Sequence, residues 1–320
     1  LSSSSAASDV YKRQSKEGVA HFAQAFLDFG DTALIPDPGY PVYYNGVILA
    51  GGKPYKMPLL ENNEFLPDLG KIPAKIARQA KIMFLNYPNN PTTGIVKDES
   101  FFKEVIKFAK KYNIIVCHDN AYSELVFDGY DSCSFLKVPG GMDVGIEFFS
   151  FSKTYSMPGW RIGFACGNEH ILGQLEKFKA FVDYGVSTFI QLAAVYALDK
   201  CDDEILKLRQ TYTSRRDKFV KEFQKIGWDI PKPLATMYLW TKVPDVYKKD
   251  LTTLEFCEKL VRDTGVVFAP GEGFGEYGSG YVRIALVTHE NRFHDAAIRI
   301  KNCYGKKCNL KGFKNNEKHG

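Results

Sequence analysis

The sequence has no apolar run that approaches the length of about 20 residues needed to cross the hydrocarbon layer of a membrane. Its serine-rich start also lacks the apolar core of a secretory signal peptide. We therefore expect no membrane-spanning segment and no membrane partner. The composition of the 320 residues, 45% hydrophobic and 25% charged, is instead typical of a globular protein with a sizeable core.

Paired cysteines are missing as well. The seven cysteines are scattered through the chain, with no Cys-x-x-Cys pair and no ligand-like clustering with histidine. A disulfide framework or a zinc site would need such spacing. We therefore expect reduced thiols, no bound metal and a cytoplasmic protein.

The excess of positive charge is confined to one end of the chain. The formal net charge is +5, and residues 301–320 contain six lysines and one glutamate, so the preceding residues are neutral overall. A nucleic-acid-binding protein would spread basic side chains over a folded face. We expect no nucleic-acid partner, and a solvated basic tail over residues 303–320.

Residues 1–14 show neither helical nor strand periodicity, and we expect them to be a non-native or disordered leader. From residue 15 onward, short apolar runs predict buried strands, and amphipathic stretches such as 99–111 predict helices. Strands that alternate with helices favour an α/β fold with a largely parallel sheet. The predicted strands are 32–35, 81–85, 114–117, 146–151 and 162–166.

The pattern changes after about residue 200, where longer helices and separate strands predict an α+β arrangement. We therefore expect a large domain over 15–200 and a smaller one over 201–302. The predicted helices of the second part are 202–225, 253–263 and 290–300, and its predicted strands are 236–241, 266–269 and 282–287.

The segment Ser-Phe-Ser-Lys, residues 150–153, carries the strongest chemical signal. Lys153 follows an apolar strand and is flanked by Ser150 and Ser152, and Arg161 follows eight residues later. A single lysine at the end of a strand is usually a solvated surface residue. Together, these side chains suit a phosphate monoester that is tethered to the lysine amine through a Schiff base, with hydroxyls and an arginine on the phosphate.

This segment resembles the cofactor-lysine motif of the fold-type I aminotransferases, which use pyridoxal 5'-phosphate and form the aspartate aminotransferase superfamily. The resemblance implies a three-layer large domain with a mainly parallel sheet, a smaller α+β domain and a homodimer. It implies that Lys153 is the catalytic residue. The whole chain is most similar to the group that contains LL-diaminopimelate and alanine aminotransferases.

Two further segments resemble the same family in the same order. Residues 86–94 resemble its Asn-Pro-Thr-Gly loop, which implies that Asn90 contacts the cofactor's phenolic oxygen and the substrate. Residues 118–122 imply that Asp119 pairs with the pyridine nitrogen, where a carboxylate makes the ring an electron sink, and that Tyr122 donates to the phenolic oxygen. Taken alone, these residues would indicate a surface turn and a helix N-cap.

Three more segments complete the resemblance. The Asp-Pro-Gly-Tyr turn implies that Tyr40 stacks on the cofactor ring, although a structural tyrosine is the alternative. Ser15 and Lys16 resemble a phosphate loop at the start of a helix, where a plain capped helix is the alternative. Arg283, in an apolar strand, matches the arginine that binds the substrate α-carboxylate, with a structural ion pair as the alternative.

The sequence departs from the family pattern at several positions. Either Thr93 stands where the family usually has glycine, or Gly94 is displaced by one residue. Gln14 replaces a glycine expected before Ser15. The family's N-terminal part is not present in this sequence, so we expect the large domain to be incomplete. The glycine-rich stretch 271–280 is weak evidence for a dinucleotide site, because a strand and not a helix follows it, and it predicts a flexible loop instead.

The resemblance implies transfer of an amino group between an L-amino acid and a 2-oxo acid, either 2-oxoglutarate or pyruvate, in amino-acid biosynthesis. Three alternatives share the fold. They are a carbon–sulfur β-lyase, a transcription regulator that senses pyridoxal phosphate, and a catalytically silent interaction protein.

Overall fold

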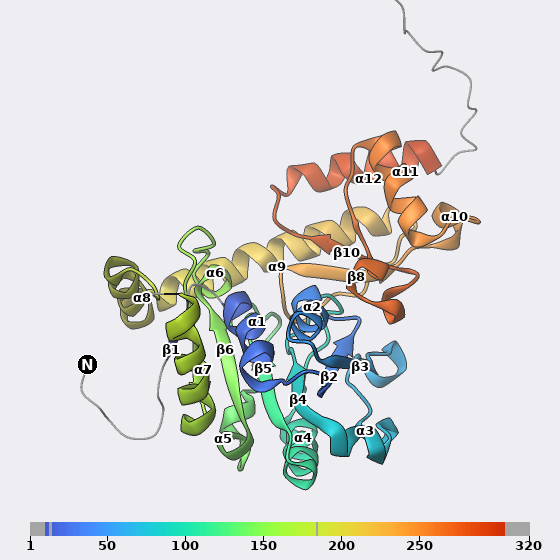
Figure 1. Cartoon of the computed structure of the whole chain (residues 1–320). Coiled ribbons are helices and arrows are strands. Elements are labelled where there is room, and N and C mark those ends of the chain that lie inside the picture. The colour runs from blue at the N-terminus through green and yellow to red at the C-terminus, as the bar shows by residue number, and fades with distance from the viewer. Residues whose placement is uncertain (1–9, 13–14, 184, 305–320) are drawn as a thin grey trace, which may run out of the picture.

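A seven-stranded sheet forms the body of the molecule (Figure 1), for which the computed structural model describes residues 10–12, 15–183 and 185–304. The strand order is β1-β7-β6-β5-β4-β2-β3. Strands β2 to β6 run parallel to one another, whereas β7 is antiparallel to both β6 and β1. The strands are β1 Val10–Lys12, β2 Thr32–Asp37, β3 Lys53–Pro58, β4 Ala80–Leu85, β5 Ile115–Asp119, β6 Gly145–Ser150 and β7 Gly163–Gly167.

Helices cover both faces of this sheet, which confirms the predicted three-layer α/β fold. Residues of β4 alternate between two hydrophobic clusters: Ile82 and Phe84 face one, and Met83 and Leu85 face the other. The first cluster contains α1 Ser15–Phe26, α2 Pro41–Leu49 and α7 Glu169–Val182. The second contains α3 Ala74–Gln79 and α4 Glu99–Tyr112, with α5 Gly141–Val144 beside them.

A second, antiparallel sheet lies beside one end of the long helix α9, which extends across Figure 1 away from α8. Its core is rich in aromatic residues and centres on Phe223 and Trp228, both fully buried. Residues 121–127, which belong to the first part of the chain, also pack into this core. The strands are β8 Tyr238–Lys242, β9 Ala269–Pro270 and β10 Tyr281–Ala285, and the helices are α9 Asp202–Gln224, α10 Asp245–Lys248, α11 Thr253–Thr264 and α12 Asn291–Tyr304.

The remaining elements are short, apart from one helix. Helix α8 spans Thr188–Lys200, and α6 is a single turn at Phe151–Thr154. The 3-10 turns are η1 Glu61–Asn63, η2 Leu69–Lys71, η3 Phe135–Lys137, η4 Gly271–Phe274 and η5 Glu276–Gly278.

Several predicted elements are corrected. Residues 10–12 form β1, because backbone pairing with β7 makes a strand without any apolar periodicity in the sequence. The predicted strand 266–269 reduces to Ala269–Pro270, and the predicted loop 271–280 contains η4 and η5. Helix α12 continues to Tyr304, so the predicted tail begins inside a helix. The other parts of the leader and tail lie outside the described residues.

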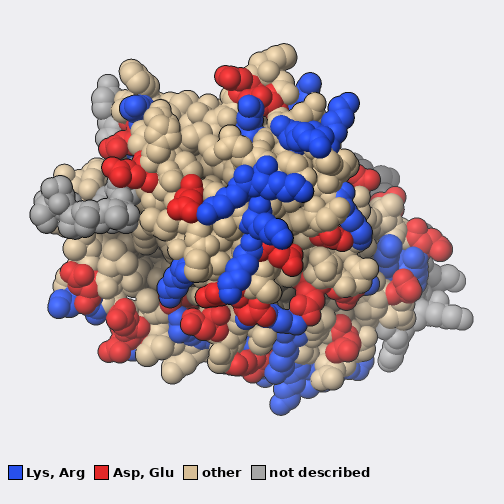
Figure 2. Space-filling view, turned by 90° about the horizontal axis from the view of Figure 1, so that it is seen from below, with Lys and Arg blue, Asp and Glu red and all other residues tan. Residues whose placement is uncertain are grey.

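Acidic and basic side chains are interspersed on the face shown in Figure 2. Lys103 pairs with Glu99 along α4, and Lys110 of the same helix pairs with Asp143. Within the part of the chain that the structure describes, no helix is both long and apolar enough to cross a membrane.

Candidate active site

All of the predicted site residues except Arg283 line one cavity of about 340 Å³. It lies where β4, β5 and β6 end, which is the edge at which open parallel sheets bind ligands. The first turn of α1 and residues from the second sheet close it. The lining residues are Ser15, Lys16, Tyr40, Tyr43, Asn86, Asn90, Asp119, Ala121, Tyr122, Ser150, Ser152, Lys153, Pro158, Arg161 and Tyr238.

Asp119 is the buried anion of this cavity. It is the last residue of β5 and is 5% exposed. The hydroxyl of Tyr43 donates to its Oδ2 at 2.9 Å, while its buried Oδ1 has no hydrogen-bond partner among the described residues. Burial raises the pKa of Asp119 to about 6, and the hydrogen bond from Tyr43 opposes that rise. The carboxyl group is therefore mainly ionised at neutral pH.

Lys153 lies opposite, on the turn α6 that follows β6. The sequence predicted a strand through Phe151, but the chain turns into a helix at that residue. This turn directs the Lys153 Nζ to 5.9 Å from the centre of the Tyr122 ring. The neighbouring Ser152 Oγ is buried and has no hydrogen-bond partner in the described part of the chain. A cation and an unsatisfied hydroxyl thus come from adjacent residues.

The other predicted phosphate contacts come from two elements. Ser15 and Lys16 form the first turn of α1, and the Lys16 Nζ is 5.4 Å from the centre of the Tyr40 ring. Arg161 lines the cavity from an exposed loop, and its guanidinium donates to the carbonyl of Pro158 at 2.5 Å. The start of a helix together with two cations suits an anionic group.

Arg283 approaches from the second sheet. Its NH1 donates to the Asn90 Oδ1 at 2.8 Å, which joins the two sheets at the site. The guanidinium lies between two aromatic rings, 4.3 Å from that of Tyr238 and 4.5 Å from that of Phe274. Its Nε is buried without a hydrogen-bond partner within the described residues. The two rings and Asn90 therefore hold the guanidinium in place, and hydrogen-bonding capacity remains for an anion.

Besides Ala121 and Pro158, three polar residues that line the cavity were not predicted from the sequence. Tyr43 lies one helical turn after Tyr40, so spacing on a helix was the signal that could have found it. Asn86 directly follows β4. A polar residue after an apolar strand was also the signal that pointed to Asp119. Tyr238 meets Tyr122 hydroxyl to hydroxyl at 3.3 Å, but it comes from β8, and nothing local in the sequence indicates this contact.

The departure at Thr93 has a backbone explanation. Thr93 adopts a φ of 59°, in the left-handed region where glycine is favoured. Its backbone N–H donates to the Asn89 carbonyl at 3.0 Å. Thr93 therefore adopts a backbone conformation that favours glycine, and Asn90 lines the cavity.

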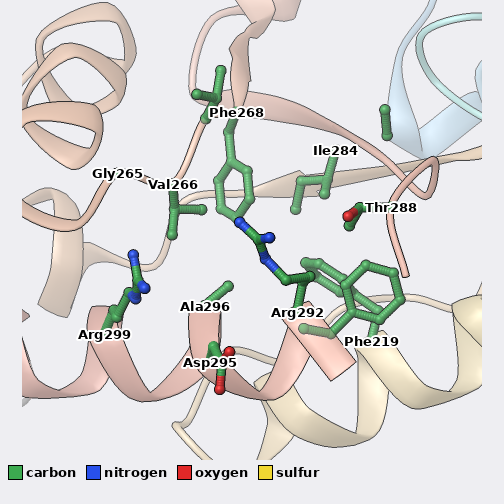
Figure 3. Close-up of a pocket in the computed structure, with 13 residues that line it drawn as sticks. Phe219, Gly265, Val266, Phe268, Ile284, Thr288, Arg292, Asp295, Ala296 and Arg299 are labelled. Atoms are coloured by element: carbon green, nitrogen blue, oxygen red, sulfur yellow. The ribbon is translucent and has the colours of Figure 1, made fainter. Parts of the chain in front are cut away.

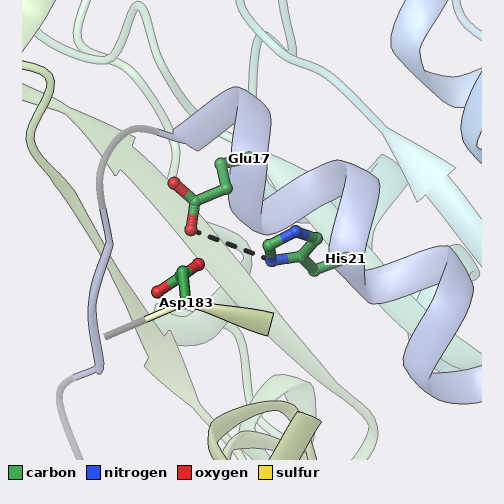
Figure 4. Close-up of side chains that lie close together, drawn as sticks. All are labelled: Glu17, His21 and Asp183. Carbon is green, nitrogen blue, oxygen red and sulfur yellow. Dashed lines mark ion pairs between the residues drawn. The ribbon is translucent and has the colours of Figure 1, made fainter. Parts of the chain in front are cut away.

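Two other clusters do not involve the predicted residues. Figure 3 shows a pocket of about 180 Å³ beside α12, flanked by Arg292 and Arg299. Figure 4 shows Glu17, His21 and Asp183, which are close enough to hold a metal ion. The ammonium group of Lys179 already pairs with both carboxylates, at 2.9 Å from Glu17, and this supplies the positive charge.

The sequence matches the family described as aminotransferase class I and II over residues 10–298. The chain therefore belongs to this family of pyridoxal-phosphate-dependent aminotransferases, as the sheet and the cavity had indicated. This membership favours amino transfer over the alternative activities considered above.

Relatives within the family cover most of the chain. It is 48% identical to the LL-diaminopimelate aminotransferases of Moorella thermoacetica and Halothermothrix orenii, over 91% and 90% of this chain and 74% and 73% of those proteins. Among solved structures, substrate-bound BacF from Bacillus subtilis has a TM-score of 0.89 at 38% identity, covering 92% of this chain and 74% of that one. A probable N-succinyldiaminopimelate aminotransferase from Thermus thermophilus has a TM-score of 0.84 at 35% identity, covering 92% and 77%.

The unsatisfied atoms of the cavity fit the cofactor of this family. An ionised carboxylate oxygen on Asp119 is a suitable partner for a protonated ring nitrogen. The unpartnered hydroxyl of Ser152 suits a phosphate oxygen, and Lys153 supplies the amine that the aldehyde requires.

We expect Tyr43→Phe to raise the pKa of Asp119 above about 6, because it removes a hydrogen bond that favours the ionised form. A carboxyl group whose pKa is higher in the folded than in the unfolded chain makes the folded state less stable as the pH rises. Between about pH 4 and about pH 7, the free energy of unfolding of the cofactor-free wild type should therefore fall by about 3 kcal/mol more than that of Asp119→Asn. The fall in Tyr43→Phe should be larger still. Urea unfolding across this range measures the difference.

Tyr44→Phe, on the exposed side of the same helix, is the matched control and should follow the wild type. Equal pH dependence in the wild type and Asp119→Asn would show that the pKa of Asp119 is not raised.

Proposed function

We propose that Lys153 carries the cofactor and moves the proton in this aminotransferase, and that LL-diaminopimelate is the amino donor. The observation that supports the site is that Lys153 and buried Asp119, which has an unsatisfied carboxylate oxygen, line the same cavity. The donor is inferred from the 48% identity to enzymes named for that substrate.

Each lining residue has a distinct part in this proposal. Pyridoxal phosphate, when bound, supplies an aldehyde and an electron-withdrawing ring that stabilises negative charge at the substrate α-carbon. Asp119 would hold the ring nitrogen protonated, and Tyr40 would cover the ring. Tyr122 would donate to the phenolic oxygen. The phosphate would be held by Ser15, Lys16, Ser150, Ser152 and Arg161.

Substrate binding and proton transfer involve residues from both sheets. The Arg283 guanidinium binds the α-carboxylate of the amino acid and of the 2-oxo acid, and Asn90 orients it through the 2.8 Å hydrogen bond. The Lys153 Nζ would take the proton from the substrate α-carbon and deliver it to the carbon of the cofactor's aldehyde group. The acceptor is 2-oxoglutarate or pyruvate, and the reverse sequence regenerates the starting state.

Lys153→Ala should abolish the covalent cofactor adduct and lower the transamination rate by about 10³-fold or more, because it removes both the anchor and the proton carrier. Reduction of the holoprotein with borohydride, digestion and mass spectrometry locate the adduct. Lys177→Ala, an exposed lysine of α7, is the control and should keep both adduct and rate. An adduct on another lysine would overturn the assignment.

The proposed donor predicts a specific order of substrates. LL-Diaminopimelate should give a kcat/KM at least about tenfold above those of L-alanine, L-glutamate and L-aspartate, because discrimination of about 1.4 kcal/mol or more is expected for a matched polar group. A coupled assay with 2-oxoglutarate and with pyruvate measures these values. Ammonia and an oxo acid formed from a β-thio amino acid without an acceptor would instead identify a lyase.

We also propose a cytoplasmic homodimer. Helix α8 is apolar around much of its surface, and Phe189, Leu192 and Tyr196 are 68%, 65% and 65% exposed on one side of it. Phe181, at the end of α7, is 93% exposed. A patch of this kind is typical of a protein interface, and a second copy of the chain is the expected partner. The cytoplasmic location rests on the scattered cysteine pattern alone.

Leu192→Glu should weaken the dimer by at least about tenfold, because it places a charge in an apolar interface. Sedimentation velocity over a range of concentrations measures the change. Leu254→Glu, at a half-exposed leucine of α11, is the matched control and should sediment like the wild type. A wild-type protein that is monomeric at tens of micromolar concentration would refute the proposal.

A further inference from the structure

A buried amide connects two residues of the proposed cofactor site. Asn86 directly follows β4 and is 1% exposed. Its Nδ2 donates to the backbone carbonyl of Asp119 at 2.6 Å, and its Oδ1 accepts from the backbone N–H of Asn90 at 2.8 Å. The Asn86 side chain thus binds the main chain at two residues that line the cavity, Asp119 and Asn90.

These two hydrogen bonds lie just past the point where the backbone pairing of β4 with β5 ends. The pairing of β4 with β5 ends at Leu85 and His118, one residue before Asn86 and Asp119. The Tyr87 backbone also donates to the His118 ring at 3.3 Å, but this bond is longer and does not involve the cavity. The Asn86 side chain therefore continues the link between the two strand ends into the site.

The loop that contains Asn90 is stiffened by its own contacts. The Asn89 side chain donates to the Asn86 carbonyl at 3.0 Å and accepts from the Thr92 backbone at 3.0 Å. Because the loop is held internally in this way, a displacement at Asn86 would move it as a unit. Asn90 would carry that displacement to Arg283 through the hydrogen bond at its Oδ1.

We propose that Asn86 is a positioning residue that couples Asp119 to Asn90 and, through Asn90, to Arg283. The group that pairs with the ring nitrogen and the group that binds the substrate carboxylate would then share one hydrogen-bonded frame. This inference rests on the roles proposed above for Asp119 and Arg283.

The residue type is required by the two partners. A carbonyl needs a donor and an N–H needs an acceptor, and a primary amide presents both from one planar group. Asn86→Ala leaves both partners unsatisfied in a buried place, which is costly. Asn86→Asp has the same shape and keeps the acceptor for Asn90, but it loses the donor for Asp119.

The test measures two constants on the full chain: the Kd of pyridoxal phosphate from its absorbance, and the KM of the amino donor. Asn86→Ala should raise both by about tenfold, since each depends on one arm of the amide. Asn86→Asp should raise the Kd of the cofactor more than the KM. This split is the signature of positioning, because a general loss of stability would not separate the two arms.

A second measurement tests the coupling to Arg283. If Asn86 acts through Asn90, then Asn86→Ala combined with Arg283→Lys should raise the KM by less than the product of the two single effects. A KM of the double variant that equals the product of the two single increases would overturn the proposal. So would a cofactor Kd and a KM that stay at wild-type values in both Asn86 variants.

Asn168→Ala is the matched control. The Asn168 amide also binds backbone carbonyls, those of Met142 and Asp143, at 3.1 and 3.2 Å, but it caps α7 away from the cavity. It should lower the free energy of unfolding and leave both constants unchanged. Absence of the Lys153 adduct in the wild-type protein would refute the proposed function. An intact adduct together with wild-type constants in the Asn86 variants would refute only the coupling.

Discussion

A buried carboxylate is the constraint on which the candidate active site depends. Burial raises the pKa of the Asp119 carboxyl group to about 6, against contributions such as the Tyr43 hydrogen bond that lower it. The Tyr43 hydroxyl limits that rise by satisfying Oδ2, and Oδ1 remains available for a ligand. Helix α2 must therefore pack against β5 closely enough to bring Tyr43 to Asp119. The packing of the large sheet thus sets the charge of the site.

The opposite charge, on Arg283, depends on how the second sheet docks. The loop between β9 and β10 is held against the first sheet by Asp37. This residue accepts hydrogen bonds from the backbones of Glu276 and Tyr277 at 3.2 and 3.0 Å. This approach requires glycine at position 275, where φ is 140° and an added Cβ would lie 2.2 Å from the Asp37 Oδ1. Phe274, next to that glycine, then lies against the Arg283 guanidinium. The Asp37 contact and Arg283 are parts of one interface.

The predicted elements with strong periodicity agree with the structure to within a few residues. The α4 helix, predicted at 99–111, spans Glu99–Tyr112, because its apolar face and the Asp98 cap are both local features. Predictions were wrong where long-range pairing decides the structure, as at β1, which exists only through its ladder with β7. Likewise, Tyr122 was predicted from its motif, whereas its contact with Tyr238 joins residues 116 positions apart.

The sequence by itself determined the family, the order of the motifs and the identity of the charged groups, because each motif is a short run whose chemistry is local. It also determined that Asp119 follows an apolar strand, and hence the edge of the sheet at which the site lies. Only the tertiary structure decided which atoms of those groups remain unsatisfied. That outcome depends on partners such as Tyr43, Asn86 and Tyr238, which packing brings together from distant parts of the chain.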